Sequence, residues 1–338
     1  MTRLSAVVLA YGEQPYVLEV VDSLLRSTGV DVDVVLVDNG CTFPDLAPLR
    51  DRPGVTLLEP GENTGFTGGC NLGARAATGD VLAFVNSDAI VDAPALAELA
   101  RVATRPEVGI ASASLRLAEQ PDRMNSAGNP VHVLGLSWAG GLDDPATAHA
   151  EEVDVASATG AAMACRRDVW DRLGGFTAEF FAYCEDADLS LRCWQAGWSV
   201  RYVPTAVVRH HYEFSRNPAK WYLLERNRLA MLLCDYELRT LVLLAPALLA
   251  LEVALFAVAV SSGWARAKFD GYRWLWRHRG WVAERRRSVQ GARRVPDRDL
   301  ARLLTARFDA RALPLPAGAG LLNAAMSAYW RAVRTVLG

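Results

Sequence analysis

The sequence has few of the features that mark secreted or zinc-scaffolded proteins. Its six cysteines form no C-x-x-C pair and no Cys/His spacing typical of a zinc site, so we expect free thiols in a reducing cytosol. The N-terminal apolar run is too short for a signal peptide, and no small-residue cleavage site follows it. Lysine occurs only at Lys220 and Lys268, so arginine carries nearly all the positive charge. These absences favour a cytoplasmic protein.

The charge of the chain is nearly balanced but unevenly distributed. A formal net charge of −2 argues against a nucleic-acid-binding protein. Beyond about residue 262, however, Arg and Lys outnumber Asp and Glu by roughly eleven. With 338 residues and 51% hydrophobic composition, the chain can bury a full core. We expect a catalytic domain over residues 1–236 and a basic, helical segment over residues 237–338.

Apolar runs and helical patterns alternate over the first hundred residues. The runs at 4–9, 32–37, 55–58 and 81–85 predict strands, and the residues from Gln14-Pro15 to Arg26 predict a helix. This alternation predicts a parallel sheet with helices on both faces. Ligand-binding groups should lie at the carboxyl ends of its strands. These ends are Ala10-Tyr11-Gly12, Asp38, residues 61–63 and Asn86-Ser87-Asp88.

The rest of the chain predicts further elements of both kinds. We expect helices at about 94–103, 168–173, 185–196 and 218–236, and a final amphipathic helix at 319–336. Strands are expected at 108–111, 156–165, 200–203 and 206–209. Residues 116–154 are irregular, and we expect loops and a minor hairpin there that cover the acceptor side.

The stretch from Asn63 to Asp88 organises the rest of the chain. A glycine-dense turn leads into a short helix, and a strand then ends on Asn86-Ser87-Asp88. Glycines let backbone N–H groups approach a phosphate, and a carboxylate past a strand end sits where open α/β sheets bind ligands. The alternative is that these glycines serve only tight turns and close helix–sheet packing. The first interpretation predicts an anion and a metal ion.

Two later groups of polar residues allow both a functional and a structural interpretation. Glu185 and Asp186 open a helix, where acidic side chains can act chemically or simply stabilise the helix dipole. His210 and His211 follow a strand, where a histidine can be a ligand or a hydrogen-bonded structural residue.

The order and spacing of Asp38, the glycine loop, Asn86-x-Asp88, Glu185-Asp186 and His210 resemble those of the inverting family-2 glycosyltransferases of GT-A fold. The chain is most similar to their bacterial rhamnosyltransferase- and galactofuranosyltransferase-like subset, over about residues 4–235. The resemblance implies a Rossmann-like, mostly parallel sheet followed by a C-terminal helical segment. It also implies transfer of a sugar, with rhamnose as one candidate, from a UDP- or dTDP-linked donor to a lipid-linked or cell-surface polysaccharide acceptor.

The resemblance also implies roles for individual residues. Asp186 matches the catalytic base, with Glu185 as its neighbour. Asp88 and His210 match ligands of Mg²⁺ or Mn²⁺, with His211 as the alternative register. Asn86 stands where the family has its first Asp, so metal binding depends on Asp88. The positions that match nucleotide-sugar-binding residues are Ala10, Tyr11, Gly12, Asp38, Asn63, Gly65, Asn71, Asn86, Ser87, Arg226 and Asn227.

The chemistry gives a reason for this set of residues. An inverting transfer needs a base for the acceptor hydroxyl and an electrophile for the departing diphosphate. Asp186 can be the base, and a cation held by oxygen and imidazole ligands can be the electrophile. No second carboxylate is needed as an acid, because the leaving group departs as a metal-bound anion.

Three other functions are considered. A sugar-1-phosphate nucleotidyltransferase would need a glycine- and Lys/Arg-rich loop after the first strand, which residues 10–16 lack. A dinucleotide dehydrogenase would need G-x-G-x-x-G there. A nucleotide-sugar-binding scaffold without turnover is suggested by Asn86, but Asp88 and Asp186 argue against it.

The run Leu241 to Val260 is long enough to span a bilayer, although Glu252 near its centre costs about 2.5–3.5 kcal/mol on insertion scales. A single span would place the Arg-rich tail opposite the cytosolic domain, against the positive-inside rule. We therefore predict an in-plane or re-entrant helix, with residues 241–290 at the inner face of the membrane. The alternative is a buried helix in a helical subdomain or a homodimer contact.

Overall fold

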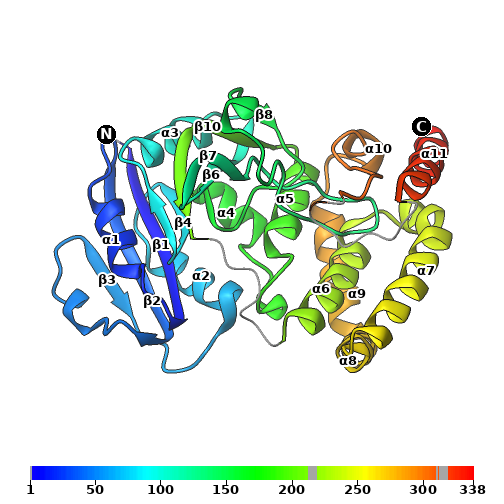
Figure 1. The fold of residues 1–338 in the computed structure, drawn as a ribbon, viewed down its shortest axis with the longest axis horizontal. Coiled ribbons are helices and arrows are strands. Elements are labelled where there is room, and N and C mark those ends of the chain that lie inside the picture. The colour runs from blue at the N-terminus through cyan, green and yellow to red at the C-terminus, as the bar shows by residue number, and fades with distance from the viewer. Residues whose placement is uncertain (1, 212–218, 310, 312–318) are drawn as a thin grey trace. The chain divides into compact units, whose positions relative to one another are not determined.

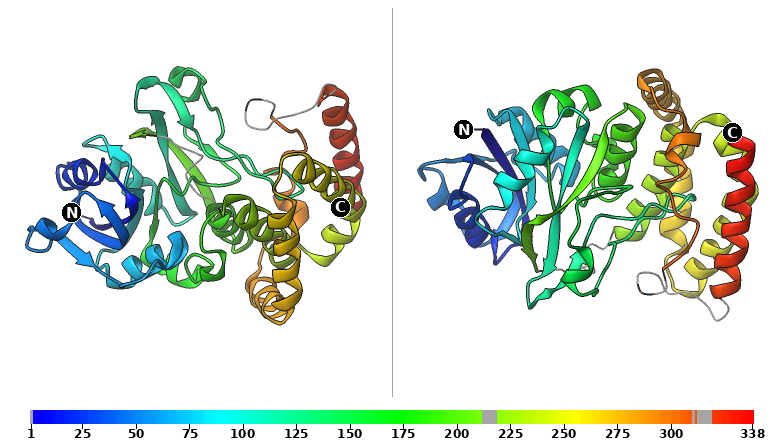
Figure 2. Two further views of the ribbon diagram at one scale, coloured as in Figure 1. Left: turned by 60° about the horizontal axis from the view of Figure 1, so that its bottom comes forward. Right: turned by 90° about the horizontal axis from the view of Figure 1, so that it is seen from above.

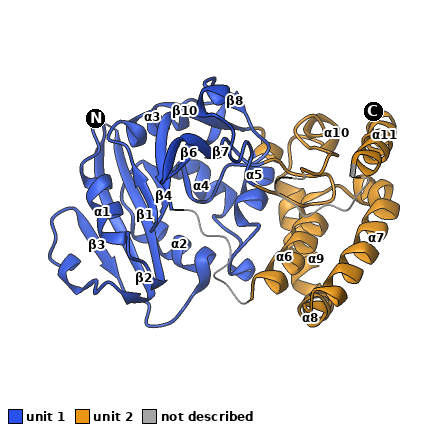
Figure 3. Cartoon of the chain, in the orientation of Figure 1, with its two compact units in different colours: residues 1–129, 139–193, 198–214 blue, residues 130–138, 194–197, 215–338 orange. Residues whose placement is uncertain are grey.

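The computed structural model describes residues 2–211, 219–309, 311 and 319–338. The chain divides into two compact units, which Figure 3 colours separately. Unit 1 comprises residues 1–129, 139–193 and 198–214, and unit 2 comprises residues 130–138, 194–197 and 215–338. The helix at 220–235 therefore belongs to unit 2, whereas the sequence prediction grouped it with the first domain.

Strands and helices of unit 1 follow the predicted alternation, and most of them are labelled in Figure 1. The strands are β1 (Arg3–Glu13), β2 (Asp31–Phe43), β3 (Val55–Leu58), β4 (Val81–Asn86), β5 (Ala89–Val91), β6 (Val108–Leu117), β7 (Gln120–Ser126), β8 (Val153–Asp154), β9 (Ala162–Arg166) and β10 (Ser199–His210). The helices are α1 (Val17–Leu25), α2 (Gly65–Ala76), α3 (Ala95–Ala103), α4 (Arg167–Leu173) and α5 (Glu185–Gln195), of which α5 ends in unit 2.

These strands form one mostly parallel sheet with ten strands in the described part of the chain. Its path is β3-β2-β1-β4-β9-β6-β10-β5, with β7 paired to β6 and β8 paired to β10. The strand β9 enters antiparallel between β4 and β6. The predicted α/β architecture is confirmed, and the antiparallel insertion of β9 is the feature that the sequence pattern did not predict.

Helices cover both faces of the sheet (Figure 2, right). Alternate residues of β1, such as Leu4 and Val8, pack with Leu24 of α1 and Leu96 of α3 in one core. On the other face, α2 approaches so closely that a Cβ atom on Gly73 would lie 2.4 Å from Val7. The sheet is thus buried on both sides, as its continuous apolar strands predict.

The glycine-dense stretch is helical rather than a loop, because α2 begins at Gly65. A Cβ atom on Gly69 would lie 2.2 Å from the side chain of Leu9. The glycines at positions 69 and 73 therefore allow close helix–sheet packing, which is the alternative interpretation of this stretch.

Several strands differ from the predicted boundaries, among them the strand predicted at 156–165, which begins at Ala162. Two other differences have clear reasons. After an irregularity, Gly12 pairs with Cys41, so β2 continues to Phe43 and Asp38 lies inside it. Pro204 separates the two strands predicted at 200–203 and 206–209, but the structure has a single β10 with a register shift between Val203 and Val207. Proline cannot donate to the ladder, and the strand accommodates it at this shift.

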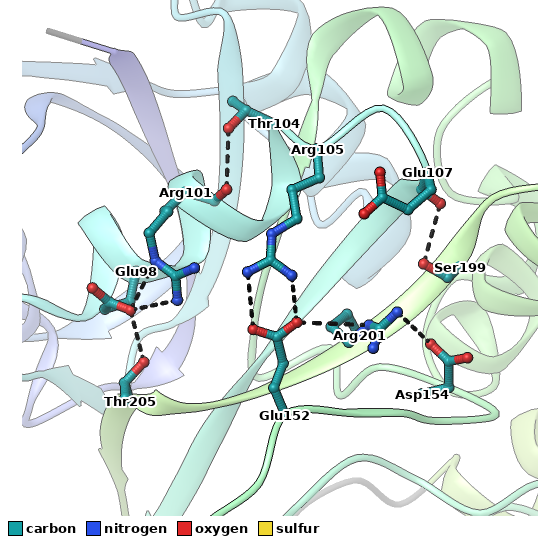
Figure 4. A network of polar contacts seen from close by, with 10 residues as sticks. All are labelled: Glu98, Arg101, Thr104, Arg105, Glu107, Glu152, Asp154, Ser199, Arg201 and Thr205. Carbon is teal, nitrogen blue, oxygen red and sulfur yellow. Dashed lines mark hydrogen bonds and ion pairs between the residues drawn. The ribbon is translucent and has the colours of Figure 1, made fainter.

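A polar network holds the segment before β8 against the outside of unit 1 (Figure 4). Arg105 donates two hydrogen bonds to Glu152, with distances of 2.6 and 3.1 Å. Arg201 of β10 pairs with Asp154 at 3.1 Å. These contacts anchor the connection between the β6–β7 hairpin and β9. The hairpin expected within residues 116–154 is present, and its position on the acceptor side stays a prediction.

Unit 2 is helical in its described residues. Its helices are α6 (Lys220–Asp235), α7 (Leu238–Ser261), α8 (Ala265–Arg277), α9 (Arg279–Ala292), α10 (Asp297–Leu300) and α11 (Ala319–Leu337). Among the described helices, α7 is the one long and apolar enough to cross a membrane by length and composition.

Candidate active site

Two strand ends of unit 1 bring Asp88 and His210 together. Asp88 lies in the turn between β4 and β5, and β5 pairs antiparallel with β10 so that Ala89 faces His210. As a result, Nε2 of His210 lies 3.1 Å from Oδ1 of Asp88. His211 points elsewhere, because its ring stacks on Tyr16 with 3.6 Å between centroids. Of the two histidines proposed as metal ligands, His210 is the one that the fold places beside Asp88.

Asn125, at the end of β7, orients the imidazole of His210. Its Oδ1 lies 2.8 Å from Nδ1 of His210. An amide oxygen only accepts hydrogen bonds, so Nδ1 carries a hydrogen, and Nε2 is the ring nitrogen that faces the Asp88 carboxylate. Either a proton on Nε2 or a bound cation joins these two atoms. The donor set therefore fits a divalent cation.

A cation at this point would need further ligands from outside the protein. In the described residues, no group of three or more His, Cys, Asp and Glu side chains could hold a metal ion. Mg²⁺ and Mn²⁺ sites of nucleotide enzymes commonly combine one or two protein ligands with substrate phosphates and water. Asp88 and His210 match that pattern.

Asp186 is held in place by three N–H donors at the start of α5. Its Oδ2 accepts hydrogen bonds from the Asn129 side chain and the Gly160 backbone, both at 3.2 Å, and its Oδ1 accepts one from Ala187 N at 2.8 Å. Burial raises the pKa of Asp186, and these hydrogen bonds oppose that rise because they stabilise the carboxylate. The side chain is thus a fixed acceptor for a proton.

Glu185 differs from Asp186 in its environment. It is 8% exposed, and its Oε2 is buried without a hydrogen-bond partner in the described residues. Burial, together with the negative charge of Asp186, raises the pKa of Glu185 to about 8. The raised pKa favours the protonated form of Glu185, whereas the hydrogen bonds to Asp186 favour its carboxylate form.

The backbone before α5 is strained. Phe181, Tyr183 and Cys184 all have φ between 65° and 71°, a region that side-chain-bearing residues rarely adopt. The first turn of α2 packs against this loop. Thr67 N donates a hydrogen bond to Phe181 O at 3.1 Å, and a Cβ atom on Gly65 would lie only 2.5 Å from that oxygen. The glycine at position 65 therefore permits the contact that holds the loop leading to Asp186.

Most residues predicted to bind the donor lie near the carboxyl ends of β1, β2 and β4. Oδ1 of Asp38 accepts hydrogen bonds from Gly40 N and Cys41 N, at 3.1 and 2.8 Å. Tyr11 is 55% exposed, and its ring lies close to Gly40. The side chains of Asn39 and Asn63 hydrogen-bond at 2.9 Å and fix the start of α2. This arrangement leaves Oδ2 of Asp38 and the ring of Tyr11 as groups that could contact a base.

Three of the predicted donor-binding residues make internal contacts. The Asn71 side-chain amide donates to Phe176 O at 2.9 Å and accepts from Phe176 N at 3.0 Å, so it holds α2 against the turn that follows α4. Gly65 N donates to Asn63 Oδ1 at 2.9 Å. The Ser87 hydroxyl donates to Gln14 at 2.7 Å. Their contact with a donor stays a prediction, as does that of Asn86, whose backbone N–H bonds Ala161 O.

Arg226 and Asn227 lie on α6 in unit 2. The guanidinium of Arg226 lies between the rings of Tyr222 and Trp274, 5.0 and 4.6 Å from their centroids, and Nε donates to Asn227 Oδ1 at 2.8 Å. Both residues are buried. Their predicted role near the diphosphate or the acceptor stays a prediction.

Asn125 and Asn129 are the site residues that sequence reasoning missed. They fall in the irregular segment where asparagine is a common turn residue, and nothing in their spacing sets them apart. The β6–β7 hairpin brings Asn125 to His210, and a bridge to Ser157 holds Asn129 beside Asp186.

Comparison with known proteins agrees with this geometry. The model of glycosyltransferase-like family 2 matches residues 2–231. The chain belongs to this family. It is 31% identical over 248 residues to the N-acetylglucosaminyl-diphospho-decaprenol L-rhamnosyltransferase of Mycobacterium tuberculosis, covering 64% of this chain and 79% of that protein. It is 32% identical over 227 residues to the O-antigen biosynthesis protein RfbC of Myxococcus xanthus, covering 62% of this chain but 17% of that protein.

Solved glycosyltransferase structures share the fold. GalNAc-T7 with UDP, GalNAc and Mn²⁺ has a TM-score of 0.58 at 16% identity, covering 69% of this chain and 48% of that chain. The mannosyltransferase PcManGT from Pyrobaculum calidifontis, with GDP-Man and Mn²⁺, has a TM-score of 0.51 at 20% identity and covers 86% of each chain. The predicted GT-A fold is therefore confirmed for this member of family 2.

Proposed function

We propose that this protein is an inverting glycosyltransferase. It transfers a sugar from a nucleoside diphosphate, UDP or dTDP, to a lipid-linked or cell-surface glycan acceptor at the cytoplasmic face of a membrane. The observation that carries the proposal is the segment 125–129, whose two asparagines hydrogen-bond His210 beside Asp88 and, separately, Asp186. One short segment thus supports both a cation site and a base, the two groups that an inverting transfer needs.

The residues of the chain have distinct roles in the proposed reaction. The carboxylate of Asp186 accepts the proton of the acceptor hydroxyl as that oxygen attacks the anomeric carbon, while Asn129 and Gly160 hold Oδ2 in place. The raised pKa of Glu185 favours its neutral form, which adds no second negative charge beside Asp186. A divalent cation held by Asp88 and His210 would supply Lewis-acid stabilisation of the diphosphate leaving group.

Two of the relatives support the acceptor class. The mycobacterial relative is named for a diphospho-decaprenol acceptor and for L-rhamnose, and the other relative is named for O-antigen biosynthesis. Both names concern polysaccharides built on cell-surface or lipid carriers, so we propose the same class here, with rhamnose as the first donor sugar to test.

Isothermal titration with UDP, dTDP and GDP, each with and without Mn²⁺, tests the proposal. We expect one pyrimidine diphosphate to bind in a metal-dependent manner, and the corresponding nucleotide sugar, dTDP-L-rhamnose first, then to turn over. Binding without turnover on any acceptor would support a nucleotide-sugar-binding scaffold. Absence of binding to all three nucleotides would contradict the proposed donor site.

A further inference from the structure

The apolar helix α7 of unit 2 is buried along one stripe. Thr240, Leu244 and Ala259 are buried, and Glu252 lies half-buried on the same stripe. Their spacings of four, eight and seven residues are those of one helix face. Near its start α7 also contacts α11, through hydrogen bonds from Arg239 to Val336 O and from Tyr329 to Leu243 O. Apart from Arg239 and Ser261, the exposed surface of α7 is apolar, and its most exposed large side chains are 59% to 68% accessible: Leu238, Val242, Leu249, Val253 and Val260.

Glu252 fixes this stripe against α6 and α8. Its carboxylate pairs with Arg228 of α6 and with Lys268 of α8, the latter at 2.9 Å, and it also accepts a hydrogen bond from Tyr272. Arg228 pairs in turn with Glu225 at 3.0 Å. The negative charge of Glu252 is therefore neutralised inside unit 2. Because Glu252 is fixed toward α6 and α8, the opposite face of α7 points outward.

The same contacts argue against α7 as a membrane span. Because α7 is fixed to α8, a bilayer crossed by α7 would also surround the exposed arginines of α8, among them Arg266 and Arg273. Each arginine at the centre of the hydrocarbon costs about 2.5–3.5 kcal/mol on insertion scales. A helix that lies in the plane of the interface avoids this cost, because only its outer face enters the apolar layer.

A basic cavity lies in the same unit, on α8. It measures about 320 Å³ and is lined by Tyr222, Asp270, Arg273, Trp274, Arg277 and His278. Asp270 neutralises part of the charge by pairing with Arg273 at 2.9 Å, which leaves the lining net positive. Arg226 stacks behind its aromatic wall. A cation-lined, aromatic-walled cavity of this size suits a phosphate group with its attached polar head.

The neighbourhood of the cavity suits a membrane interface. Trp276 and Phe269, also on α8, are 71% and 60% exposed. Exposed tryptophan beside arginine is typical of helices at the headgroup level, where the ring is partly apolar and the cation meets lipid phosphate.

We infer that unit 2 docks on the surface of an anionic bilayer, with the outer face of α7 in the acyl region and the cavity on α8 binding a lipid phosphate. The inference deepens the proposed function and rests on it for the reason why this enzyme would visit a membrane. The surface itself is derived from unit 2 alone.

Flotation of the full chain with vesicles tests the inference. Phosphatidylcholine vesicles with and without phosphatidylglycerol are compared for the wild type and three double variants. Leu249→Glu/Val253→Glu charges the outer face of α7 and should abolish binding to both kinds of vesicle. Arg273→Ala/Arg277→Ala should lose about tenfold in affinity for the anionic vesicles only. The matched control, Arg26→Ala/Arg75→Ala, removes the same charge from exposed positions of unit 1 and should change affinity little.

Several outcomes would overturn the inference. If detergent but not alkaline carbonate released the wild type, α7 would span the membrane. If the cavity variant and the control lost the same affinity for anionic vesicles, general charge attraction rather than the cavity would explain the binding. If the wild type did not bind vesicles but formed a dimer in light scattering, and the α7 variant did not, the outer face of α7 would instead be a contact with a second copy of the chain. Failure of the wild type to float at all would exclude docking.

Two further measurements distinguish the possible sources of the phosphate and check that the variants are folded. Titration with inorganic pyrophosphate and with farnesyl diphosphate shows whether a free phosphate group or a lipid-borne diphosphate binds the cavity without a bilayer. Loss of either in the Arg273→Ala/Arg277→Ala variant supports the cavity, and unchanged binding contradicts it. Nucleotide titration of all variants shows that unit 1 is intact, so failed docking and failed donor binding remain distinguishable.

Discussion

Asn129 offers the sharpest test of how the base is tuned. Its Nδ2 donates to Asp186 Oδ2 at 3.2 Å, and its Oδ1 accepts from the Ser126 hydroxyl at 2.9 Å. Its backbone N–H and C=O both bond Ser157, at 2.8 and 3.1 Å, so Asn129→Ala keeps the main chain in place. The substitution therefore removes one donor from the carboxylate and little else.

The expected size of the effect follows from this hydrogen bond. Hydrogen bonds to charged groups contribute about 1.5–3 kcal/mol, and a distance of 3.2 Å is at the long end of the range, so we use about 1.5 kcal/mol. Because about 1.4 kcal/mol corresponds to one pKa unit, the pKa of Asp186 should rise by about one unit. Asp186 must be deprotonated to act as the base, so activity is lost as the pH falls through its pKa.

The assay is the pH dependence of kcat/KM, followed through release of the nucleoside diphosphate from the donor found by titration. We expect the acid limb of Asn129→Ala to move up by about one pH unit, with a smaller change on the plateau. Ser126→Ala leaves Nδ2 of Asn129 in place and should move the limb less. A uniform loss of rate with an unmoved limb would show that Asn129 does not act on the base, and the reasoning would be refuted.

Three further predictions concern separate parts of the chain. Asp186→Asn should abolish transfer and leave donor affinity nearly unchanged, whereas Asp88→Ala should weaken metal-dependent donor binding; titration that shows equal losses would contradict both roles. Because the raised pKa of Glu185 favours the protonated folded state, the free energy of unfolding should fall as pH rises from about 4.3 to about 8, and Glu185→Gln should remove that slope in urea melts. Gly73→Ala should destabilise the chain by about 1–3 kcal/mol in the same melts, because its Cβ would meet Val7, while Gly280→Ala on α9 has open space and should not destabilise.

The sequence predicted the order of strands and helices well because most boundaries depend on local chemistry. The apolar run at 55–58 matches β3, and Glu185 opens α5 as its acidic first turn predicts. The antiparallel position of β9 could not be predicted in this way. Its place between β4 and β6 depends on pairings between residues far apart in the chain, and these leave no periodic signal.

Sequence patterns selected residues that the fold brings together where a residue type is uncommon at its position, and their roles stay predictions. An Asp after an apolar strand and an acidic pair at a helix start are both recognisable patterns, and the structure places Asp88 beside His210. Prediction was weaker for the glycine stretch. Close packing and phosphate binding both require glycine, so the sequence could not distinguish them. The structure shows that the glycines at positions 65, 69 and 73 each allow a close internal approach.

The residues that orient the site are the ones whose signal is weakest. Asn125 and Asn129 look like ordinary turn residues, yet each bonds a group with a proposed chemical role. Their backbone belongs to the end of β7 and the turn after it, and β7 is paired to the central strand β6. The pairing of β7 with β6 therefore fixes Asn125 beside the proposed cation ligand, whereas the bridge from Asn129 to Ser157 fixes Asn129 beside the base. A change in the pairing of β7 should consequently disturb His210 more than Asp186, although only four peptide bonds separate the two asparagines.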